Sequence, residues 1–277
     1  MVKTLRDALT EGIQLLGDTT DATVLLCHAA GLDRLQLAVH SGEQIENHIY
    51  DVYMEYINRR KKCEPVAYIT GIKEFMGLDF EVRPGVLIPR PDTEHTVEYI
   101  IDIFRDAQPR ILDLCTGSGA IAVSLAHYLP GTQVVAADIS DIALQVASAN
   151  ASRNNVSDRV RVVRADALER YDFDTAFDVV VSNPPYIPDS VVPTLDADVA
   201  DYEPHLALCG GDDGLNFYRA IAVNALEVLP GGGRLVFEVG HDQAEAVLDL
   251  LSEHYRDIEF VRDYAGINRV VAATKKE

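Results

Sequence analysis

Residues 110–122 read RILDLCTGSGAIA, and this stretch decides the fold. Its first part, 110–114, is mostly apolar and predicts a strand, and the apolar residues over 120–128 predict a helix. Between them, Gly117 and Gly119 let the backbone turn tightly and pass close to a ligand. A strand that turns through glycines into a helix is typical of a nucleotide-binding α/β domain.

The same alternation continues toward the C-terminus. Further strands are expected at 133–138, 160–164, 177–182 and 235–239, and helices at 141–154, 213–228 and 243–254. This alternation predicts a parallel sheet with helices on both faces. The last two strands, 258–262 and 269–273, are only about six residues apart, which is too few for a parallel crossover. The last strand should therefore run antiparallel.

A small helical bundle is expected over 1–70. Apolar residues recur at helical spacing from Leu5 to Leu16 and from Ile49 to Ile57, and Gly31 is placed to end a helix between them. The histidines of this region are scattered, and a satisfied core or surface position explains each better than a ligand role. A bundle without chemistry is often a docking surface, which is the role expected here.

Short extended pieces around Met76 and Gly77 suggest that 71–91 is a hairpin linker. The remaining residues, 92–277, form the main domain. Asp92 or Thr93 is expected to cap its first helix, which should run to about residue 106.

Composition limits the partners. The chain has 277 residues and a formal net charge of −20, from 24 Lys and Arg against 44 Asp and Glu. Such a surface opposes binding to a phosphate backbone, so direct nucleic-acid binding is not expected. The run Arg59-Arg60-Lys61-Lys62 is a local basic exception, better explained as the solvated end of a helix, where cations suit the dipole.

Cysteine use and the N-terminal residues indicate a cytoplasmic protein. No apolar run approaches membrane-spanning length, and Asp7 and Glu11 interrupt the start where a signal peptide needs an apolar stretch, so no membrane partner is expected. The cysteines are far apart and suggest neither a disulfide framework nor a zinc site; they are Cys27, Cys63, Cys115 and Cys209.

The strand expected at 177–182 leads into the second deciding motif, Asn183-Pro184-Pro185-Tyr186. The prolines fix φ near about −65° and remove two N–H donors, and Pro184 keeps Asn183 extended. The Asn183 side-chain oxygen and the Pro184 carbonyl are therefore expected to face one point, with the Tyr186 ring covering it. That point suits an NH2 group, either an exocyclic amine or a carboxamide. A bare proline-rich turn is often only an exit from a core strand, but an asparagine at this strand end favours a site.

Acidic residues follow the two neighbouring strands. Asp138, nineteen residues after Gly119, is placed to bind two ribose hydroxyls, and Asp166 with Ala167 is placed to reach an adenine ring. Taken singly, each aspartate is equally well explained as a turn or capping residue. Together, at successive strand ends, they favour a cofactor that carries a ribose.

Gly117-x-Gly119-x-x-Ala122 also fits a dinucleotide fingerprint, so NAD is an alternative cofactor. The antiparallel last strand and the acceptor turn at Asn183 disfavour it. So does Asp113, because a carboxylate there would repel a pyrophosphate. The same carboxylate suits the ammonium and sulfonium of S-adenosylmethionine, directly or through water.

These motifs resemble the PrmC/HemK family, the protein-glutamine N5-methyltransferases that modify peptide chain release factors. The resemblance covers about residue 20 to the end. It rests on PVAYITG (65–71), IPRPDTE (88–94), DLCTGSGAIA (113–122), SNPPYI (182–187), YEP (202–204) and GGDDGL (210–215). NPPY alone is shared with adenine and cytosine amino-methyltransferases of nucleic acids, so it identifies only the chemistry.

The resemblance implies a seven-stranded class I S-adenosylmethionine-dependent methyltransferase fold, Rossmann-like, with an antiparallel last strand. It implies S-adenosylmethionine as donor, S-adenosylhomocysteine as product, no metal, and the glutamine of the release-factor Gly-Gly-Gln loop as acceptor. Its cofactor positions fall on Cys115, Thr116, Gly117, Ser118, Gly119, Asp138, Asp166, Ala167 and Asn183. Its glutamine-binding and catalytic positions fall on Asn183, Pro184, Pro185 and Tyr186. Cys115 is a departure, since many members have glycine there.

Other interpretations stay open at this point. A nucleic-acid amino-methyltransferase would need cations near the site, yet 189–203 contains five acidic residues and no Lys or Arg. A release-factor-binding module without activity would not need the NPPY turn or the glycine loop. Glu203 either orients Asn183 or caps a turn, and Asp212 or Asp213 is expected to cap the helix that follows.

Overall fold

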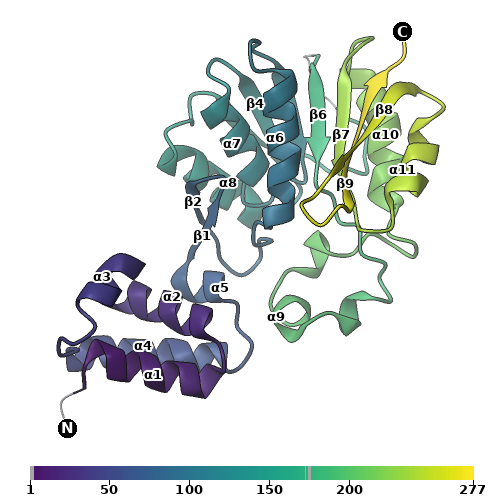
Figure 1. The fold of residues 1–277 in the computed structure, drawn as a ribbon. Helices are drawn as coiled ribbons and strands as arrows, with labels where there is room; N and C mark the ends of the chain where they lie inside the picture. Colours follow the sequence, from purple (N-terminus) through teal and green to yellow (C-terminus); the bar gives the residue numbers. More distant parts are fainter. Residues whose placement is uncertain (1–2, 172, 174–175) are drawn as a thin grey trace. The chain divides into compact units, whose positions relative to one another are not determined.

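The computed structural model describes residues 3–171, 173 and 176–277. The chain forms two units (Figure 1). The first comprises the residues up to Ile72 together with Asp196–Tyr202, and the second comprises Lys73–Leu195 and Glu203–Glu277. The segment Asp196–Tyr202 thus belongs to the N-terminal unit although it is distant in sequence.

The first unit is helical. Its helices are α1 (Leu5–Leu16), α2 (Thr19–Ala30), α3 (Arg34–Val39), α4 (Asn47–Arg60), α5 (Val66–Thr70) and the short α9 (Ala197–Ala200). Gly31 ends α2 with φ of 65°, as the sequence predicts. Helices α1 and α4 pack closely at Gly12, since a Cβ added there would lie 1.8 Å from the Tyr53 hydroxyl. A residue with a side chain would not fit at this position. The core includes Leu25, Leu26, Tyr53 and Ile57.

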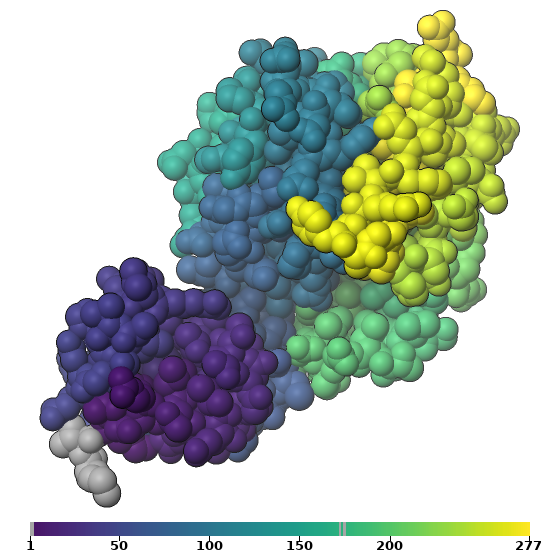
Figure 2. Space-filling model, in the orientation of Figure 1, coloured from purple at the N-terminus to yellow at the C-terminus, as the bar shows by residue number. Residues whose placement is uncertain are grey.

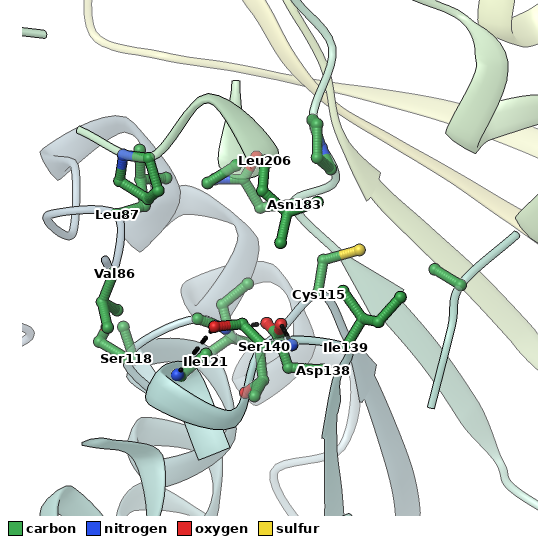
Figure 3. Close-up of a pocket in the computed structure, with 18 of the residues that line it drawn as sticks. Val86, Leu87, Cys115, Ser118, Ile121, Asp138, Ile139, Ser140, Asn183 and Leu206 are labelled. Carbon is green, nitrogen blue, oxygen red and sulfur yellow. Dashed lines mark hydrogen bonds between the residues drawn. The ribbon is translucent and has the colours of Figure 1, made fainter. Parts of the chain in front are cut away.

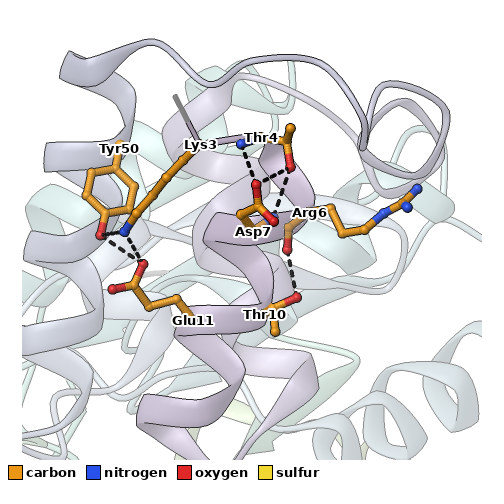
Figure 4. Close-up of polar contacts among 7 residues, drawn as sticks. All are labelled: Lys3, Thr4, Arg6, Asp7, Thr10, Glu11 and Tyr50. Atoms are coloured by element: carbon orange, nitrogen blue, oxygen red, sulfur yellow. Dashed lines mark hydrogen bonds and ion pairs between the residues drawn. The ribbon is translucent and has the colours of Figure 1, made fainter. Parts of the chain in front are cut away.

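Polar contacts fix the start of α1 (Figure 4). The Thr4 side chain accepts from the Asp7 backbone N–H, and the Asp7 carboxylate accepts from the Thr4 N–H, which together form a capping box. Lys3 Nζ lies 2.5 Å from Glu11 Oε2, and the Tyr50 hydroxyl donates to the same carboxylate at 2.9 Å. These contacts tie α1 to α4.

The two arginines that end α4, Arg59 and Arg60, pair with acids of their own unit. Arg59 contacts Glu64 at 2.6 Å. Arg60 lies 2.6 Å from Asp21 and 3.6 Å from Asp198, and so holds both α2 and the Asp196–Tyr202 segment. These contacts occupy two of the four cations of the run 59–62 and help to hold the helical unit together.

The second unit is built on a seven-stranded sheet of order β5-β4-β3-β6-β7-β9-β8. Its strands are β3 (Arg110–Leu114), β4 (Gln133–Asp138), β5 (Val160–Arg164), β6 (Val179–Ser182), β7 (Arg234–Glu238), β8 (Tyr255–Arg262) and β9 (Asn268–Lys275). The first five are parallel, and β9 is antiparallel to both β7 and β8. The predicted parallel sheet with an antiparallel last strand is confirmed. Figure 2 shows the C-terminal residues, in yellow, on the surface of this unit.

Helices cover both faces of the sheet (Figure 1). They are α6 (Glu94–Ile103), α7 (Ala120–Tyr128), α8 (Asp141–Arg153), α10 (Asn216–Val228) and α11 (Ala244–Leu251). Ile111 packs in a core with α6, α7 and α8, whereas its neighbour Leu112 packs in the core with α10 and α11. This alternation along one strand is the expected pattern for a sheet buried on both sides.

The remaining elements are short. A two-stranded hairpin, β1 (Ile72–Phe75) and β2 (Leu78–Glu81), precedes the sheet, and single 3-10 turns occur at Pro91–Thr93, Val192–Thr194 and His205–Ala207. Within the linker expected over 71–91, residues 86–88 form a loop. Within the part of the chain described here, every helix falls short of the length and apolar character needed to cross a bilayer.

Two capping predictions are wrong. Helix α6 begins at Glu94 without a side-chain cap, because Asp92 forms an ion pair with Arg269 at 3.0 Å and Thr93 accepts from Asn183. Helix α10 begins at Asn216, later than expected, and its N-terminus also lacks a side-chain cap. In both cases the polar residues before the helix are used elsewhere.

Candidate active site

The loop after β3 forms the floor of the site. Cys115, Gly117 and Gly119 all have positive φ, at 59°, 55° and 80°. At Gly119, an added Cβ would lie 3.1 Å from the Ala147 side chain, so glycine also allows α8 to approach. Residues with a side chain disfavour the left-handed conformation that Cys115 adopts, so this position would suit glycine.

Asp113 lies beneath this loop rather than in the pocket wall. Its carboxylate accepts from the Thr116 hydroxyl at 2.5 Å and from the Ala122 backbone N–H at 3.2 Å. It is fully buried, and burial raises its pKa to about 7, with the charge of Asp138 adding to the effect. Asp113 therefore fixes the loop to the start of α7. It is not among the residues that line the pocket, and the interaction predicted for it, directly or through water, stays a prediction.

Asp138 ends β4 and lines the pocket (Figure 3). One carboxylate oxygen accepts from the Gly117 N–H at 2.9 Å, and the other accepts from the Ser140 N–H at 2.9 Å. Burial raises the pKa of this carboxyl, although both backbone hydrogen bonds act to lower it. Each oxygen keeps a lone pair, so the group can still accept from hydroxyls of a ligand.

The next part of the wall combines polar and apolar groups. Asp166 and Ala167 line the pocket after β5, and Asp166 accepts from the Leu168 N–H at 2.9 Å. Two large apolar side chains also line the pocket: Ile139, next to Asp138, and Leu168, two residues after Asp166. They remain 37% and 46% exposed. Apolar surfaces beside acceptors fit a planar base with an exocyclic amine.

The NPPY turn follows β6. The Ser182 hydroxyl donates to the Leu114 carbonyl at 2.7 Å, which locks the end of β6 onto β3. Asn183 and Pro185 line the pocket, and Asn183 Nδ2 donates to Thr93 Oγ1 at 3.2 Å. The Asn183 side-chain oxygen is therefore the atom of this amide that is left for a ligand.

The rest of the turn is packed into the protein. Pro184 is buried, and the role predicted for its carbonyl stays a prediction. Burial raises the pKa of Tyr186 to about 12, with Glu238 adding to the effect, so its hydroxyl stays neutral. The Tyr186 carbonyl accepts from Gln243 at 2.9 Å.

The GGDDGL stretch supports this turn from behind. Cβ atoms added at Gly210 and Gly214 would lie 2.8 Å from Tyr186 Cα and 2.3 Å from the Tyr186 carbonyl oxygen. Glycine is thus needed for close packing on the NPPY backbone. Asp213, expected as an N-cap, instead accepts from the Leu215 N–H at 3.1 Å and pairs with Arg219.

Glu203 binds the loop that follows the β1–β2 hairpin. Its side chain is almost fully buried, accepts from the Ile88 N–H at 3.3 Å and forms an ion pair with Arg90 at 2.5 Å. Because Arg90 lines the pocket, this pair links the YEP segment to the pocket wall. The sequence offered two other roles for Glu203, and neither included Arg90.

One pocket thus gathers most of the predicted site. Of the predicted residues it is lined by Cys115, Thr116, Gly117, Ser118, Asp138, Asp166, Ala167, Asn183 and Pro185. Gly119, Pro184 and Tyr186 lie behind this wall. Sequence reasoning missed several apolar side chains that line the pocket. Ile121 lies in the quoted motif 113–122 without having been singled out, and Val86, Leu87, Leu206 and Phe217 belong to no quoted motif. Across 3–171, 173 and 176–277, no three His, Cys, Asp or Glu side chains gather in a way that would hold a metal ion.

Solved structures share this fold. The catalytic domain of human Mettl16, bound to an RNA hairpin, superposes with a TM-score of 0.62 at 17% identity, covering 76% of this chain and 81% of that one. A methyltransferase from Pyrococcus furiosus gives a TM-score of 0.56 at 20% identity, covering 74% and 92%. Identities this low show the fold alone.

Sequence comparisons go further. Residues 92–196 match the methyltransferase small domain, and 7–71 match the PrmC N-terminal domain. The release factor glutamine methyltransferase of Clostridium acetobutylicum is 42% identical over 98% of both chains. That of Bradyrhizobium diazoefficiens is 40% identical over 98% of this chain and 91% of its own.

Fold and site define a class I methyltransferase, a class that takes its methyl group from S-adenosylmethionine. More particularly, the chain belongs to the release factor glutamine methyltransferase (PrmC) family.

Proposed function

We propose that this protein transfers a methyl group from S-adenosylmethionine to N5 of a glutamine side chain, in the Gly-Gly-Gln loop of peptide chain release factors. The observation that carries the proposal is the Asn183 amide, whose nitrogen is engaged by Thr93 and whose oxygen is left to accept from a substrate NH2. Family membership supports the choice of glutamine over other amines.

The pocket residues fit the cofactor. Asp138 would hold ribose hydroxyls, the loop of Cys115 to Gly119 would pass along the ligand, and Ile139 and Leu168 would flank the adenine. S-adenosylmethionine supplies an electrophilic methyl group on a positively charged sulfur. The proposal includes no metal, because transfer of this methyl needs no Lewis acid.

A carboxamide nitrogen is a weak nucleophile because its lone pair is delocalised into the carbonyl. The protein therefore has to make this nitrogen more reactive. An acceptor at Asn183 Oδ1, with the Pro184 carbonyl beside it, would hold both N–H bonds of the glutamine and so orient the lone pair. The same acceptors stabilise the positive charge that develops on nitrogen as the N–C bond forms and the methyl leaves the sulfur. The methylated nitrogen then loses one proton to water. Losing one such preorganised contact costs on the order of 3 kcal/mol in the transition state. Holding the reactants in line supplies much of the remaining rate gain.

The helical unit is proposed to dock the release factor away from its Gly-Gly-Gln loop. We place the reaction in the cytoplasm, where its free cysteines would stay reduced. Nucleic acid is not proposed as a substrate, because five acidic residues lie over 189–203 and Arg59 and Arg60 are paired.

The test uses S-adenosylmethionine labelled in its methyl group, a purified release factor, and the same factor with its loop glutamine changed to alanine. Label should enter only the factor that keeps the glutamine. Asn183→Ala should lower the rate of methyl transfer by about 100-fold, because losing one preorganised contact costs on the order of 3 kcal/mol in the transition state. Cofactor affinity, measured by calorimetry, should stay within a few-fold of the wild-type value.

Label that enters both factors equally would refute the proposed acceptor. An equal loss of transfer and of cofactor affinity in Asn183→Ala would show that Asn183 mainly serves the cofactor.

A further inference from the structure

Glu238, the last residue of β7, is a buried carboxylate that the site described above does not use. It is 2% exposed, and its Oε2 has no hydrogen-bond partner among the described residues. The Tyr218 hydroxyl donates to its backbone carbonyl at 2.9 Å, which holds the main chain in place. A buried carboxylate costs free energy, so its retention at this strand end calls for a reason.

The Glu238 side chain lies beside Asn183, whose amide is the proposed hydrogen-bond acceptor, and beside Thr93, which contacts that amide. The Thr93 and Asn183 side chains lie close enough to the Glu238 carboxylate to lower its pKa, and Asn183 Nδ2 donates to Thr93 Oγ1 at 3.2 Å. The three residues come from the ends of β7 and β6 and from the turn before α6. Asn183 lines the pocket, whereas Glu238 is not among the lining residues.

The donors and acceptors of these three side chains determine which side of the Asn183 amide faces the pocket. An ionised carboxylate only accepts, and a threonine hydroxyl has one hydrogen to donate. When Thr93 donates to ionised Glu238, its oxygen is left to accept from Asn183, which must then present Nδ2. The Asn183 oxygen consequently faces the pocket.

When Glu238 is protonated, the hydrogen bonds no longer favour this orientation of the Asn183 amide. The carboxylic acid can donate to Thr93, whose own hydrogen is then free for the Asn183 oxygen. The amide can turn over and place Nδ2 toward the substrate NH2, where donor meets donor. The cluster would then hold the wrong face of Asn183 toward the glutamine.

We propose that Glu238 is a positioning residue which, in its ionised form and through the Thr93 hydroxyl, fixes the Asn183 amide with its oxygen toward the substrate. This inference rests on the proposed amide chemistry of the site. It adds a proton-dependent step to that chemistry, because the acceptor is correctly oriented only while Glu238 is charged.

The charge of Glu238 should change within the working pH range. Burial raises its pKa to about 7; Asp92 adds to the rise, whereas Thr93, Arg269 and Asn183 lower it. The phenols of Tyr186 and Tyr218 also face this group and stay neutral, since burial raises their pKa values. Methyl transfer by the wild-type protein should therefore rise as pH passes through about 7 and level off above it.

Glu238→Gln is the first test. A glutamine amide can donate as well as accept, so the Thr93 hydroxyl and the Asn183 amide no longer have one preferred orientation. We expect kcat to fall at least 30-fold, cofactor affinity to stay within about threefold, and the rise in rate near pH 7 to disappear. A variant that keeps the wild-type pH profile would overturn the proposal.

Thr93 provides the matched pair of variants. Thr93→Val keeps the shape and removes the hydroxyl, so it should lower kcat as Glu238→Gln does, and Thr93→Ser should restore most of the rate. Thr132→Val is the control, because Thr132 is also buried and its hydroxyl has no partner. Equal losses in Thr93→Val and Thr132→Val would indicate a purely structural effect.

A measurement without turnover separates this inference from the proposed function. The side-chain NH2 signals of Asn183 in an NMR spectrum, assigned from their loss in Asn183→Asp, should titrate near pH 7 in the wild type and not in Glu238→Gln. This result would support the inference even if the release factor were not methylated. Signals that do not move with pH in the wild type would refute it.

Discussion

Asn150 on α8 is the residue whose replacement best tests how the hairpin supports the site. Its Nδ2 donates to the Glu81 carbonyl at 3.0 Å and to the Ser118 carbonyl at 2.9 Å, and its Oδ1 accepts from the Glu81 N–H at 2.7 Å. The side chain is fully buried. One amide thus joins β2 to the glycine loop of the pocket.

Asn150→Leu keeps the number and branching of the side-chain heavy atoms, with bulkier methyl groups, so no cavity is expected, and it removes all three hydrogen bonds. At roughly 1 kcal/mol each, with more where a buried group is left without a partner, the free energy of unfolding should fall by about 3 kcal/mol. Because Ser118 lines the pocket, cofactor affinity should also fall, by about tenfold.

Urea denaturation followed by circular dichroism measures the stability, and calorimetry measures cofactor binding. Asn154→Ala is the control: Asn154 lies one turn further along, is more exposed, and donates to the Asp79 carbonyl at 3.2 Å. It should cost less than 1 kcal/mol and leave binding unchanged. If both variants lost the same small amount, the coupling of hairpin to glycine loop would be refuted.

Two further predictions concern the carboxylates. Asp138→Ala should weaken S-adenosylmethionine binding by at least 30-fold while the protein stays folded; unchanged calorimetry would show that the ribose assignment is wrong. For Asp113, the pKa is about 7 in the folded protein against 3.8 normally, so between pH 4 and 7 the folded state holds the extra proton. The free energy of unfolding should then fall as pH rises over that range, by up to about 1.4 kcal/mol per pH unit, and Asp113→Asn should flatten this slope in urea titrations at each pH.

Local sequence patterns were sufficient for the sheet. The bounds of β3, β4 and β5 agree with the predicted strands. β3 and β4 are mostly apolar runs that end at a turn or an acidic residue, and three of the five residues of β5 are valines. The antiparallel direction of β9 followed from the length of one connection. Such features depend on neighbours in the chain, which the sequence displays directly.

The contacts that shape the pocket were not predictable in the same way. Arg90 pairs with Glu203 across 113 positions, and Asn150 meets Glu81 across 69. No spacing or propensity marks such partners, because they meet only after the sheet has formed. For the same reason Thr93 was expected as a helix cap, although its hydroxyl serves Asn183.

The placement of Asp196–Tyr202 affects how the protein can be divided. The chain passes between the two units three times, after Ile72, after Leu195 and after Tyr202. A truncated protein that starts at Lys73 would keep this segment but lose Arg60, which pairs with Asp198, and Lys62, whose carbonyl accepts from Tyr202 at 2.7 Å. Inactivity of such a fragment could reflect damage to the loop between NPPY and GGDDGL as well as loss of a docking surface. Point substitutions on the exposed side of α3, such as Leu35→Ser, are the cleaner way to test the helical unit.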